Sequence, residues 1–314
     1  MKALVTGGAG FIGSHLVRAL LERGDRVVVL DNFASGRRSN LDELTGEIEL
    51  VEGDLRSYER VHAAMKGVEL VFHEGALPSV PRSVQDPLTT NEVNVSGTLN
   101  VLLAARDEGV RRVVFASSSS VYGDADGFPR DESQRPQPLS PYGVAKLAAE
   151  SYCRAFWQVY RLETVSLRYF NVFGPRQDPH SQYAAVVPRF IARLLEGKPP
   201  VIYGDGNQSR DFTYVGNVVA GNLLAASAPG VAGAVLNVAT GGSLTVNELC
   251  AAIRESLGID IEPVYEPARV GEVEHSAADI SSATRLLGYE PLQSVEEGIA
   301  TTIDSLRAAQ AMSA

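Results

Sequence analysis

The sequence predicts an α/β protein whose central parallel sheet has helices on both faces. In its first half, short apolar segments alternate with stretches that have the periodicity of amphipathic helices. Parallel strands need a crossover connection, and a helix in that connection covers one face of the sheet. A glycine-rich turn directly after the first apolar segment supports the same architecture. We therefore expect a Rossmann-type doubly wound sheet, followed by a smaller C-terminal α/β domain.

The expected strands are the apolar segments of the first half, at residues 3–5, 27–30, 48–51, 70–72, 113–116 and 164–167. Helical patterns fill the intervals, notably 88–107 and 142–160. After about residue 171, glycine and proline interrupt the chain, and further helices are expected near 184–195, 215–227, 245–257 and 295–309. We assign residues 1–170, with a return segment near 211–240, to the sheet domain, and residues 171–314 to a substrate-binding domain.

The composition excludes several classes of protein. A net charge of -10 and a pI near 5.1 argue against a nucleic acid or an anionic membrane as partner. No apolar run approaches the roughly 20 residues that span a bilayer. The two cysteines, Cys153 and Cys250, are expected to be core thiols in a reducing cytoplasm. His73 and His275 have no second ligand at useful spacing, so no metal is expected.

A cofactor site is indicated directly after the first strand. Glycines at 7, 10 and 13 let the backbone turn tightly and approach a pyrophosphate at the start of a helix, whose first turn contains Phe11 and Ile12. The bare pattern Gly7-x-x-Gly10-x-x-Gly13 also fits a generic glycine-rich turn. The preceding strand and following helix favour a dinucleotide.

Acidic residues after the second and third strands refine this cofactor prediction. Asp31, followed by Asn32, ends the second strand, where a carboxylate accepts both ribose hydroxyls of adenosine. This favours NAD over NADP, although Asp31 also fits a solvated acid or a helix cap, and Arg37 and Arg38 are near enough in sequence to bind a 2′-phosphate. Asp54, followed by Leu55, is placed to accept the adenine amino group, or else to occupy an ordinary turn.

The chemistry is indicated by Tyr142 and Lys146, which lie four residues apart at the start of an expected helix and therefore share one face. An ammonium beside a phenol should lower the tyrosine pKa and produce a base for a hydroxyl proton. A chance Tyr-x-x-x-Lys occurs on many helices. Here, however, residues 117–120 are four serines at the carboxyl end of a strand, where such sheets bind ligands.

Together these motifs resemble the extended short-chain dehydrogenase/reductase family, and within it the nucleotide-sugar 4-epimerases. The resemblance runs along essentially the whole chain and also includes His73-x-x-Ala76, residues 168–175, 204–206 and 210–212, and Arg269-x-Gly271-Glu272. It implies a catalytic triad of Ser118, Tyr142 and Lys146. Ser117 and Ser119 are alternatives at the substrate.

The resemblance also implies the reaction. Related dehydratases and decarboxylases carry an acid just before Val121-Tyr122-Gly123, whereas this chain has Ser119-Ser120. Epimerisation is therefore favoured. Tyr142 would remove the proton of the sugar's 4-hydroxyl while hydride passes to NAD, and the resulting 4-keto sugar would turn over and be reduced from its other face, with NAD retained as a cofactor.

For the substrate, the resemblance assigns the following residues. Arg210 and Arg269 would bind the diphosphate, with Asn171 on the same side and Glu272 on the ribose, although either arginine also fits an ordinary surface position. Residues 185–188, including Val187, would contact uracil through their backbone, with Tyr203 nearby. Ser79 and Arg82 would lie near the sugar.

Ser276 bears on the choice of sugar. It stands where some epimerases restricted to UDP-glucose have tyrosine, and its small side chain leaves room for a 2-acetamido group. We therefore expect UDP-N-acetylglucosamine and UDP-N-acetylgalactosamine to be substrates alongside UDP-glucose and UDP-galactose.

Three further expectations accompany this prediction. The alternative enzyme is a UDP-glucuronate 4-epimerase, in which Arg82 or Arg176 would meet the carboxylate. A non-catalytic NAD-binding sensor is the alternative outside enzymes, but it would not need Ser118, Tyr142 and Lys146 intact.

Apolar residues at 93, 99, 101, 102, 144, 147, 152 and 156 also suggest that the helices at 88–107 and 142–160 pair across a two-fold axis in a homodimer.

Overall fold

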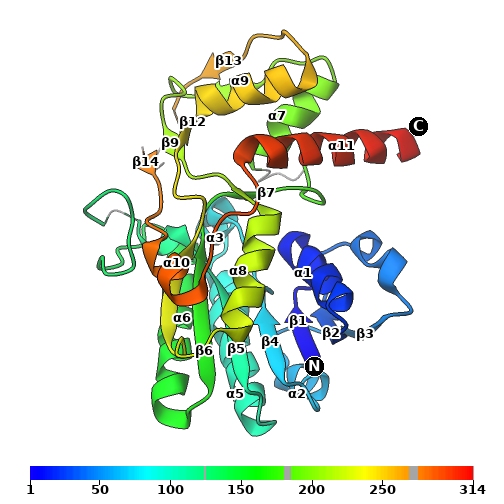
Figure 1. The fold of residues 1–314 in the computed structure, drawn as a ribbon, viewed down its shortest axis with the longest axis vertical. Coiled ribbons are helices and arrows are strands. Elements are labelled where there is room, and N and C mark those ends of the chain that lie inside the picture. Colours follow the sequence, from blue (N-terminus) through cyan, green and yellow to red (C-terminus); the bar gives the residue numbers. More distant parts are fainter. Residues whose placement is uncertain (124, 180–184, 269–274, 314) are drawn as a thin grey trace.

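The computed structural model describes residues 1–123, 125–179, 185–268 and 275–313. Within them, the main feature is a sheet of seven parallel strands in the order β11-β6-β5-β4-β1-β2-β3 (Figure 1). Its strands are β1 (Lys2–Thr6), β2 (Arg26–Asp31), β3 (Ile48–Glu52), β4 (Leu70–His73), β5 (Arg112–Ser118), β6 (Glu163–Tyr169) and β11 (Ala234–Val238). The six strands expected from apolar segments are confirmed, and so is the doubly wound fold class.

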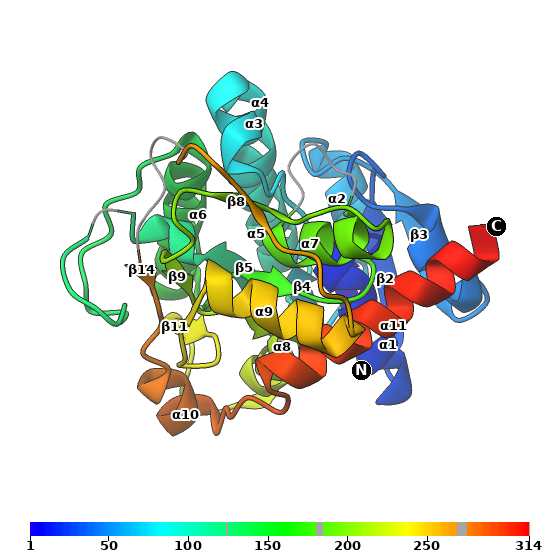
Figure 2. The ribbon, with the colours of Figure 1, turned by 90° about the horizontal axis from the view of Figure 1, so that it is seen from above.

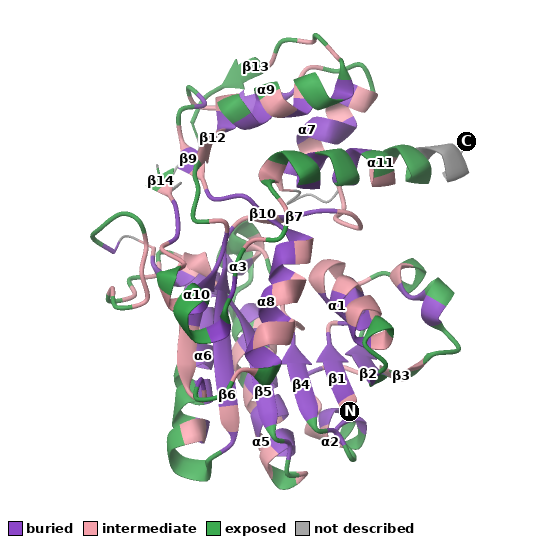
Figure 3. Ribbon diagram, viewed as in Figure 1, coloured by how far each residue is buried: buried purple, intermediate pink, exposed green. Residues whose placement is uncertain are grey.

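Helices cover both faces of this sheet. On one face, α1 (Phe11–Glu22), α8 (Val215–Ser227) and α10 (Ser281–Leu287) enclose a core that contains Val5, Phe72 and Leu236. On the other face, α2 (Tyr58–Ala64), α5 (Gly97–Asp107) and α6 (Pro141–Tyr160) enclose a second core. Cys153 is buried there, as expected for a core thiol. The strands between these layers are mostly buried, except for the edge strand β3, whose residues are half-buried or exposed (Figure 3).

The helix expected over 88–107 is interrupted. After α3 (Val80–Gln85), the chain forms α4 (Pro87–Asn91), a π-helical turn at Glu92–Ser96, and only then α5. The buried Asn94 side chain accepts from the N–H of Leu77 at 2.8 Å and donates to its carbonyl at 3.1 Å. This clamp holds the wider turn against the loop that follows β4, so a single regular helix does not form.

The C-terminal lobe lies above the carboxyl ends of the strands (Figures 1 and 2). Its core lies between α7 (Val186–Leu195), α9 (Val246–Leu257) and α11 (Val295–Ser313), and it includes the second buried thiol, Cys250. Short strands complete the lobe, namely β7 (Val172–Phe173), β8 (Val201–Tyr203), β9 (Ser209–Arg210), β10 (Thr213–Tyr214), β12 (Leu244–Thr245), β13 (Val264–Glu266) and β14 (His275–Ser276). Among the residues described, none of the helices is both long and apolar enough to cross a membrane.

Candidate active site

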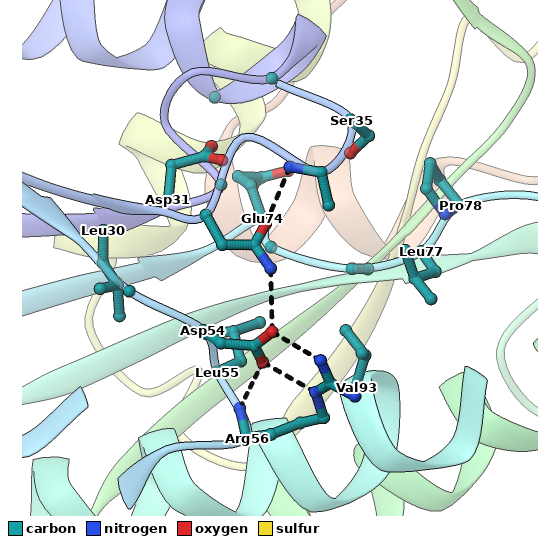
Figure 4. Close-up of a pocket in the computed structure, with 18 of the residues that line it drawn as sticks. Leu30, Asp31, Ser35, Asp54, Leu55, Arg56, Glu74, Leu77, Pro78 and Val93 are labelled. Atoms are coloured by element: carbon teal, nitrogen blue, oxygen red, sulfur yellow. Dashed lines mark hydrogen bonds and ion pairs between the residues drawn. The ribbon is translucent and has the colours of Figure 1, made fainter. Parts of the chain in front are cut away.

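A cavity of about 310 Å³ opens at the carboxyl ends of β1, β2 and β4 (Figure 4). Its walls come from the loops that follow β1, β2, β3 and β4, from the first turn of α1, and from residues of α3, α4 and the π-helical turn. Of the residues predicted to bind the cofactor, Tyr142 and Lys146 are not in its lining, whereas it is lined by Gly7, Gly10, Phe11, Ile12, Gly13, Asp31, Asn32, Asp54 and Leu55, together with Glu74, Ala76 and Arg82. The structure thus brings most of the proposed cofactor residues together around one space.

The glycine-rich loop is shaped for close backbone approach. Gly7 has φ +68°, and a Cβ there would lie 2.7 Å from the backbone of Gly75. A Cβ on Gly13 would lie 2.2 Å from the carbonyl oxygen of Gly7. Helix α1 begins within this loop, at Phe11. Its N-cap is Gly10, which has no side chain. The N–H groups of the first turn are therefore available for an anion such as a pyrophosphate.

Asp31 lies at the end of β2 with its carboxylate fixed by the backbone. It accepts from the N–H of Ala9 at 3.0 Å and from that of Phe33 at 2.8 Å. Burial raises its pKa, while these N–H donors act in the opposite direction. Arg37 is ion-paired with Asp178, and Arg38 with Glu52. Asp31 is thus fixed where the ribose is expected, and the charges of Arg37 and Arg38 are paired with acids. This arrangement fits NAD better than a cofactor with a 2′-phosphate.

Asp54 is bound within a small polar cluster on the cavity wall (Figure 4). It accepts from the Asn32 amide at 3.0 Å and from the Arg56 guanidinium at 2.8 Å. The hydrogen bonds from Arg56 lower the pKa of Asp54 to about 2. Asp54 is therefore an acceptor at neutral pH, and its contact with adenine stays a prediction.

The catalytic candidates meet where α6 starts against the end of β5. The hydroxyl of Ser118 accepts from the N–H of Ser120 at 3.1 Å, and it acts on the phenol of Tyr142 as a neighbour that lowers the phenol's pKa. The Lys146 ammonium donates to the carbonyl of Ala116 at 2.7 Å and lies 5.9 Å from the centroid of the Tyr142 ring. All three side chains thus converge at the carboxyl edge, where the resemblance places the chemistry.

The ionisation of Tyr142 differs from the sequence prediction. Burial raises its pKa to about 12, and Glu74 acts in the same direction, while the Ser118 hydroxyl opposes the rise. The ammonium of Lys146 is bound to a backbone carbonyl, and burial lowers its own pKa to about 8. In the protein alone, Lys146 therefore does not lower the Tyr142 pKa below its usual value, because the desolvation of the phenolate outweighs the attraction.

The serines of the run have different surroundings. Ser117 is buried, and its hydroxyl donates to Glu150, which is held by two hydrogen bonds from Arg168 at 2.9 and 2.8 Å. This position within the packed layer between β5 and α6 does not favour the expected role of Ser117 at the substrate. Ser119 is half-buried in the short 3₁₀ turn Ser119–Val121. Of Ser117 and Ser118, it is Ser118 that acts on the Tyr142 phenol, whereas Ser117 is bonded to Glu150.

The segment that contains Ser79 and Arg82 contributes an unforeseen contact. Ser79 caps α3 by accepting from the N–H of Arg82 at 3.1 Å, and Arg82 lines the cofactor cavity. Ser83 is fully buried, and its hydroxyl accepts from the N–H of Tyr142 at 3.1 Å. Sequence reasoning had no signal for this contact, because the two residues are 59 positions apart.

Among the residues predicted to bind the substrate, Arg210 and Ser276 lie together in the structure. They are register partners in the pairing of β9 with β14, although 66 residues separate them in the sequence. Asn171 has a positive φ of 33° and donates to the carbonyl of Asp211, next to Arg210, at 3.0 Å. Arg210, Asn171 and Ser276, three of the residues predicted to bind the substrate, thus lie close together.

The remaining substrate candidates lie apart from this group or outside the described residues. The side chain of Val187 is buried in the lobe's own core, so only its backbone is left for a ligand. Tyr203 packs against Arg189, whose guanidinium carbon lies 5.5 Å from the ring centroid. Arg269 and Glu272 fall outside the described residues.

The histidines singled out above have hydrogen-bond partners in the protein. His73 is buried between the hydroxyls of Thr6, at 2.7 Å, and Thr98, at 2.9 Å, and burial lowers its pKa to about 3. The His275 ring lies 3.0 Å from the hydroxyl of Ser209. In the described part of the chain, no three His, Cys, Asp or Glu side chains are grouped as a metal site.

Comparison with known proteins gives a consistent result. Residues 3–239 match the model of the NAD dependent epimerase/dehydratase family. The UDP-glucose 4-epimerase of Mycolicibacterium smegmatis is 40% identical, over 98% of this chain and 99% of that protein.

Two solved structures share both fold and sequence. A UDP-glucose 4-epimerase of Thermotoga maritima, crystallised with UDP-glucose, has a TM-score of 0.94 and 40% identity, covering 99% of this chain and 100% of its own. A UDP-N-acetylglucosamine 4-epimerase of Methanobrevibacter ruminantium, in complex with UDP-N-acetylmuramic acid, has a TM-score of 0.94 and 41% identity, covering 98% of each chain.

Proposed function

The chain belongs to the NAD-dependent epimerase/dehydratase family, and from this premise we propose that it is a UDP-sugar 4-epimerase. The observation that carries the proposal is the convergence of Ser118, Tyr142 and Lys146 at the edge of the sheet where the cofactor cavity opens. Ser119 and Ser120 stand where related dehydratases have an acid, which favours epimerisation over elimination of water.

The residues divide the work as follows. The glycine-rich loop and Asp31 hold NAD, which supplies the hydride acceptor and donor when bound. Tyr142 takes the proton of the sugar hydroxyl and returns it after the sugar has turned. The Ser118 hydroxyl forms hydrogen bonds with the Tyr142 phenol and with the reacting oxygen of the substrate. Lys146 places a positive charge near the phenol, which favours the phenolate as the proton leaves.

For the sugar, we propose that both the glucose and the N-acetylglucosamine series are substrates. Ser276 is half-buried and pairs with Arg210, so a small side chain stands next to a residue that would hold the diphosphate. Both kinds of 4-epimerase occur among the relatives at similar identity. The glucuronate alternative has less support, because Arg176 donates to Ser14 on α1 at 3.2 Å and Arg82 lines the cofactor cavity.

The test is an assay of the purified protein with UDP-glucose, UDP-N-acetylglucosamine and UDP-glucuronate, first without added NAD. We expect chromatography to show UDP-galactose and UDP-N-acetylgalactosamine. Activity without added cofactor would support retained NAD. A dehydrated product, or no epimer from any substrate even with NAD present, would contradict the proposal.

We also propose a cytoplasmic homodimer. The exposed apolar residues Val84, Leu88, Val144, Tyr152 and Val159 lie on α3, α4 and α6, which contact one another. This face differs in part from the sequence prediction, because the side chains at 101, 102 and 156 are buried in the protomer's own core. The two buried thiols suit a reducing compartment.

A further inference from the structure

Glu74 is a half-buried acid that the motifs did not single out. It follows β4 and lines the cofactor cavity. His73, the preceding residue, is the register partner of Phe115 on β5. Lys146 lies 5.0 Å from the centroid of the Phe115 ring and donates to the carbonyl of the next residue, Ala116. Glu74 thus borders the cofactor cavity and follows a strand whose end pairs with the strand that binds Lys146.

The carboxyl group of Glu74 is held by a chain of hydrogen bonds. The hydroxyl of Tyr169 donates to its Oε1 at 2.8 Å, and the amide of Asn222 on α8 donates to the same hydroxyl at 2.7 Å. Tyr169 is also the register partner of Ser118. The acid is thus anchored to the strand ends that carry the catalytic serine, and its position is fixed by the fold.

The charged and titratable groups around Glu74 come from a few elements. Tyr169 on β6 and Lys146 on α6 each lower the pKa of Glu74. Glu74 in turn raises the pKa of Tyr142 and of Lys146, both on α6. His73, its neighbour on β4, is engaged with Thr6 and Thr98. Burial raises the pKa of Glu74 to about 7, against the effects of Tyr169 and Lys146. Its charge therefore changes near neutral pH.

We propose that Glu74 is a positioning residue that sets the charge balance of the Tyr142–Lys146 pair, and with it the pH range in which the enzyme turns over. The inference rests on the proposed function. As an anion, Glu74 stabilises the ammonium of Lys146 and opposes the phenolate of Tyr142, so it raises the pKa of both groups. Neutralising Glu74 should lower both values together.

The test is Glu74→Gln, which keeps an oxygen acceptor for Tyr169 and removes the charge. Both limbs of the kcat–pH profile should move toward acid by roughly one pH unit, the size expected for one charge at short range in a protein interior. Tyr169→Phe, which removes the donor that favours the charged form, should move both limbs in the same direction by less. Glu69→Gln is the matched control, because Glu69 is exposed at the opposite end of β4 and should leave the profile unchanged.

A second measurement does not depend on turnover. The tyrosinate absorption of the NAD-loaded protein, corrected by subtracting the corresponding Tyr142→Phe protein, reports the titration of Tyr142 alone. We expect Glu74→Gln to move it to lower pH. If no UDP-sugar is epimerised but this shift occurs, the proposed function fails and the role of Glu74 stands. A lower rate with unmoved limbs and an unmoved tyrosinate titration would overturn the inference.

Discussion

Tyr142 is fixed at both its backbone and its side chain. Its N–H donates to the buried Ser83, and its hydroxyl has Ser118 as a polar neighbour that favours the ionised phenol. These contacts come from different elements, α3 and β5, so the phenol is positioned before any substrate binds. Such preorganisation suits a proton transfer whose donor and acceptor must lie within hydrogen-bond distance.

Replacing this phenol gives the most direct prediction. Tyr142→Phe should lower kcat for UDP-glucose by about 10²- to 10⁴-fold, because the general base is lost while the ring still packs. NAD binding, measured by calorimetry, should remain. Tyr160→Phe, at the exposed end of the same helix, is the control and should keep full activity. Undiminished turnover by Tyr142→Phe would rule out Tyr142 as the base.

Ser276 gives a prediction about specificity. In Ser276→Tyr, the ring should fill the space assigned to the acetamido group, so kcat/KM for UDP-N-acetylglucosamine should fall at least about tenfold, as for a steric penalty of 1–3 kcal/mol. UDP-glucose serves as the internal control and should be turned over at a similar rate. Equal loss with both substrates would show that Ser276 does not distinguish the sugars.

Residues within local motifs were predictable, whereas those whose partners are distant in sequence were not. The glycines, Asp31 and the Tyr142–Lys146 spacing each follow from neighbours a few positions away. Glu74 had only a weak local signal, since an acid after a buried strand also fits an ordinary turn. Ser117 and Ser118 could have been separated, because consecutive residues of a strand face opposite sides.

At the level of elements, α6 is held to the sheet by a buried ion pair. Glu150 and Arg168 are each about 4% exposed, and they join α6 to β6. The same helix begins with Ser140, whose hydroxyl accepts from the N–H of Gly143 at 3.1 Å. The pair and the cap fix the register of the helix that carries Tyr142 and Lys146.

Breaking this pair should be costly. Glu150→Ala leaves the Arg168 guanidinium buried without its partner, so the free energy of unfolding should fall by about 3–5 kcal/mol in urea denaturation. Lys198→Ala, which removes the surface pair with Glu196, should change it by less than about 1 kcal/mol. If both variants lost the same small amount, the buried pair would not be a principal tie of α6.

Strands were easier to predict than the details of helices. Strands buried on both faces are continuous apolar runs, so their positions follow from composition. The break at Glu92–Ser96 depends on Asn94 binding the backbone of Leu77, which is 17 residues away. No local pattern reports such a contact.

On the scale of the whole molecule, the apolar face formed by α3, α4 and α6 has no cover within the described protomer. Leu88 is 78% exposed and Val144 is 54% exposed. Both lie close to the start of α6, the helix that carries the catalytic pair. Pairing of this face would therefore bury surface next to the active site.

This arrangement predicts the assembly. The native protein should have the solution mass of a dimer by light scattering, and Val144→Glu should shift it toward the monomer, because a charge would be buried in the interface. Leu292→Glu, at an apolar side chain that is 72% exposed elsewhere, should leave the mass unchanged. A native protein of monomeric mass would contradict the proposal.

The last strand of the sheet has a consequence for dividing the chain. β11 and α8 join the sheet only after the chain has passed through α7 and β8. A fragment cut after residue 170 would lack both, leaving β6 as an unpaired edge. Arg112 would also lose the two carbonyls of Ala225 and Ala228 that accept its hydrogen bonds. Such a fragment would expose the unpaired backbone edge of β6 and should aggregate. We therefore do not expect residues 1–170 to be obtained as a folded protein by simple truncation.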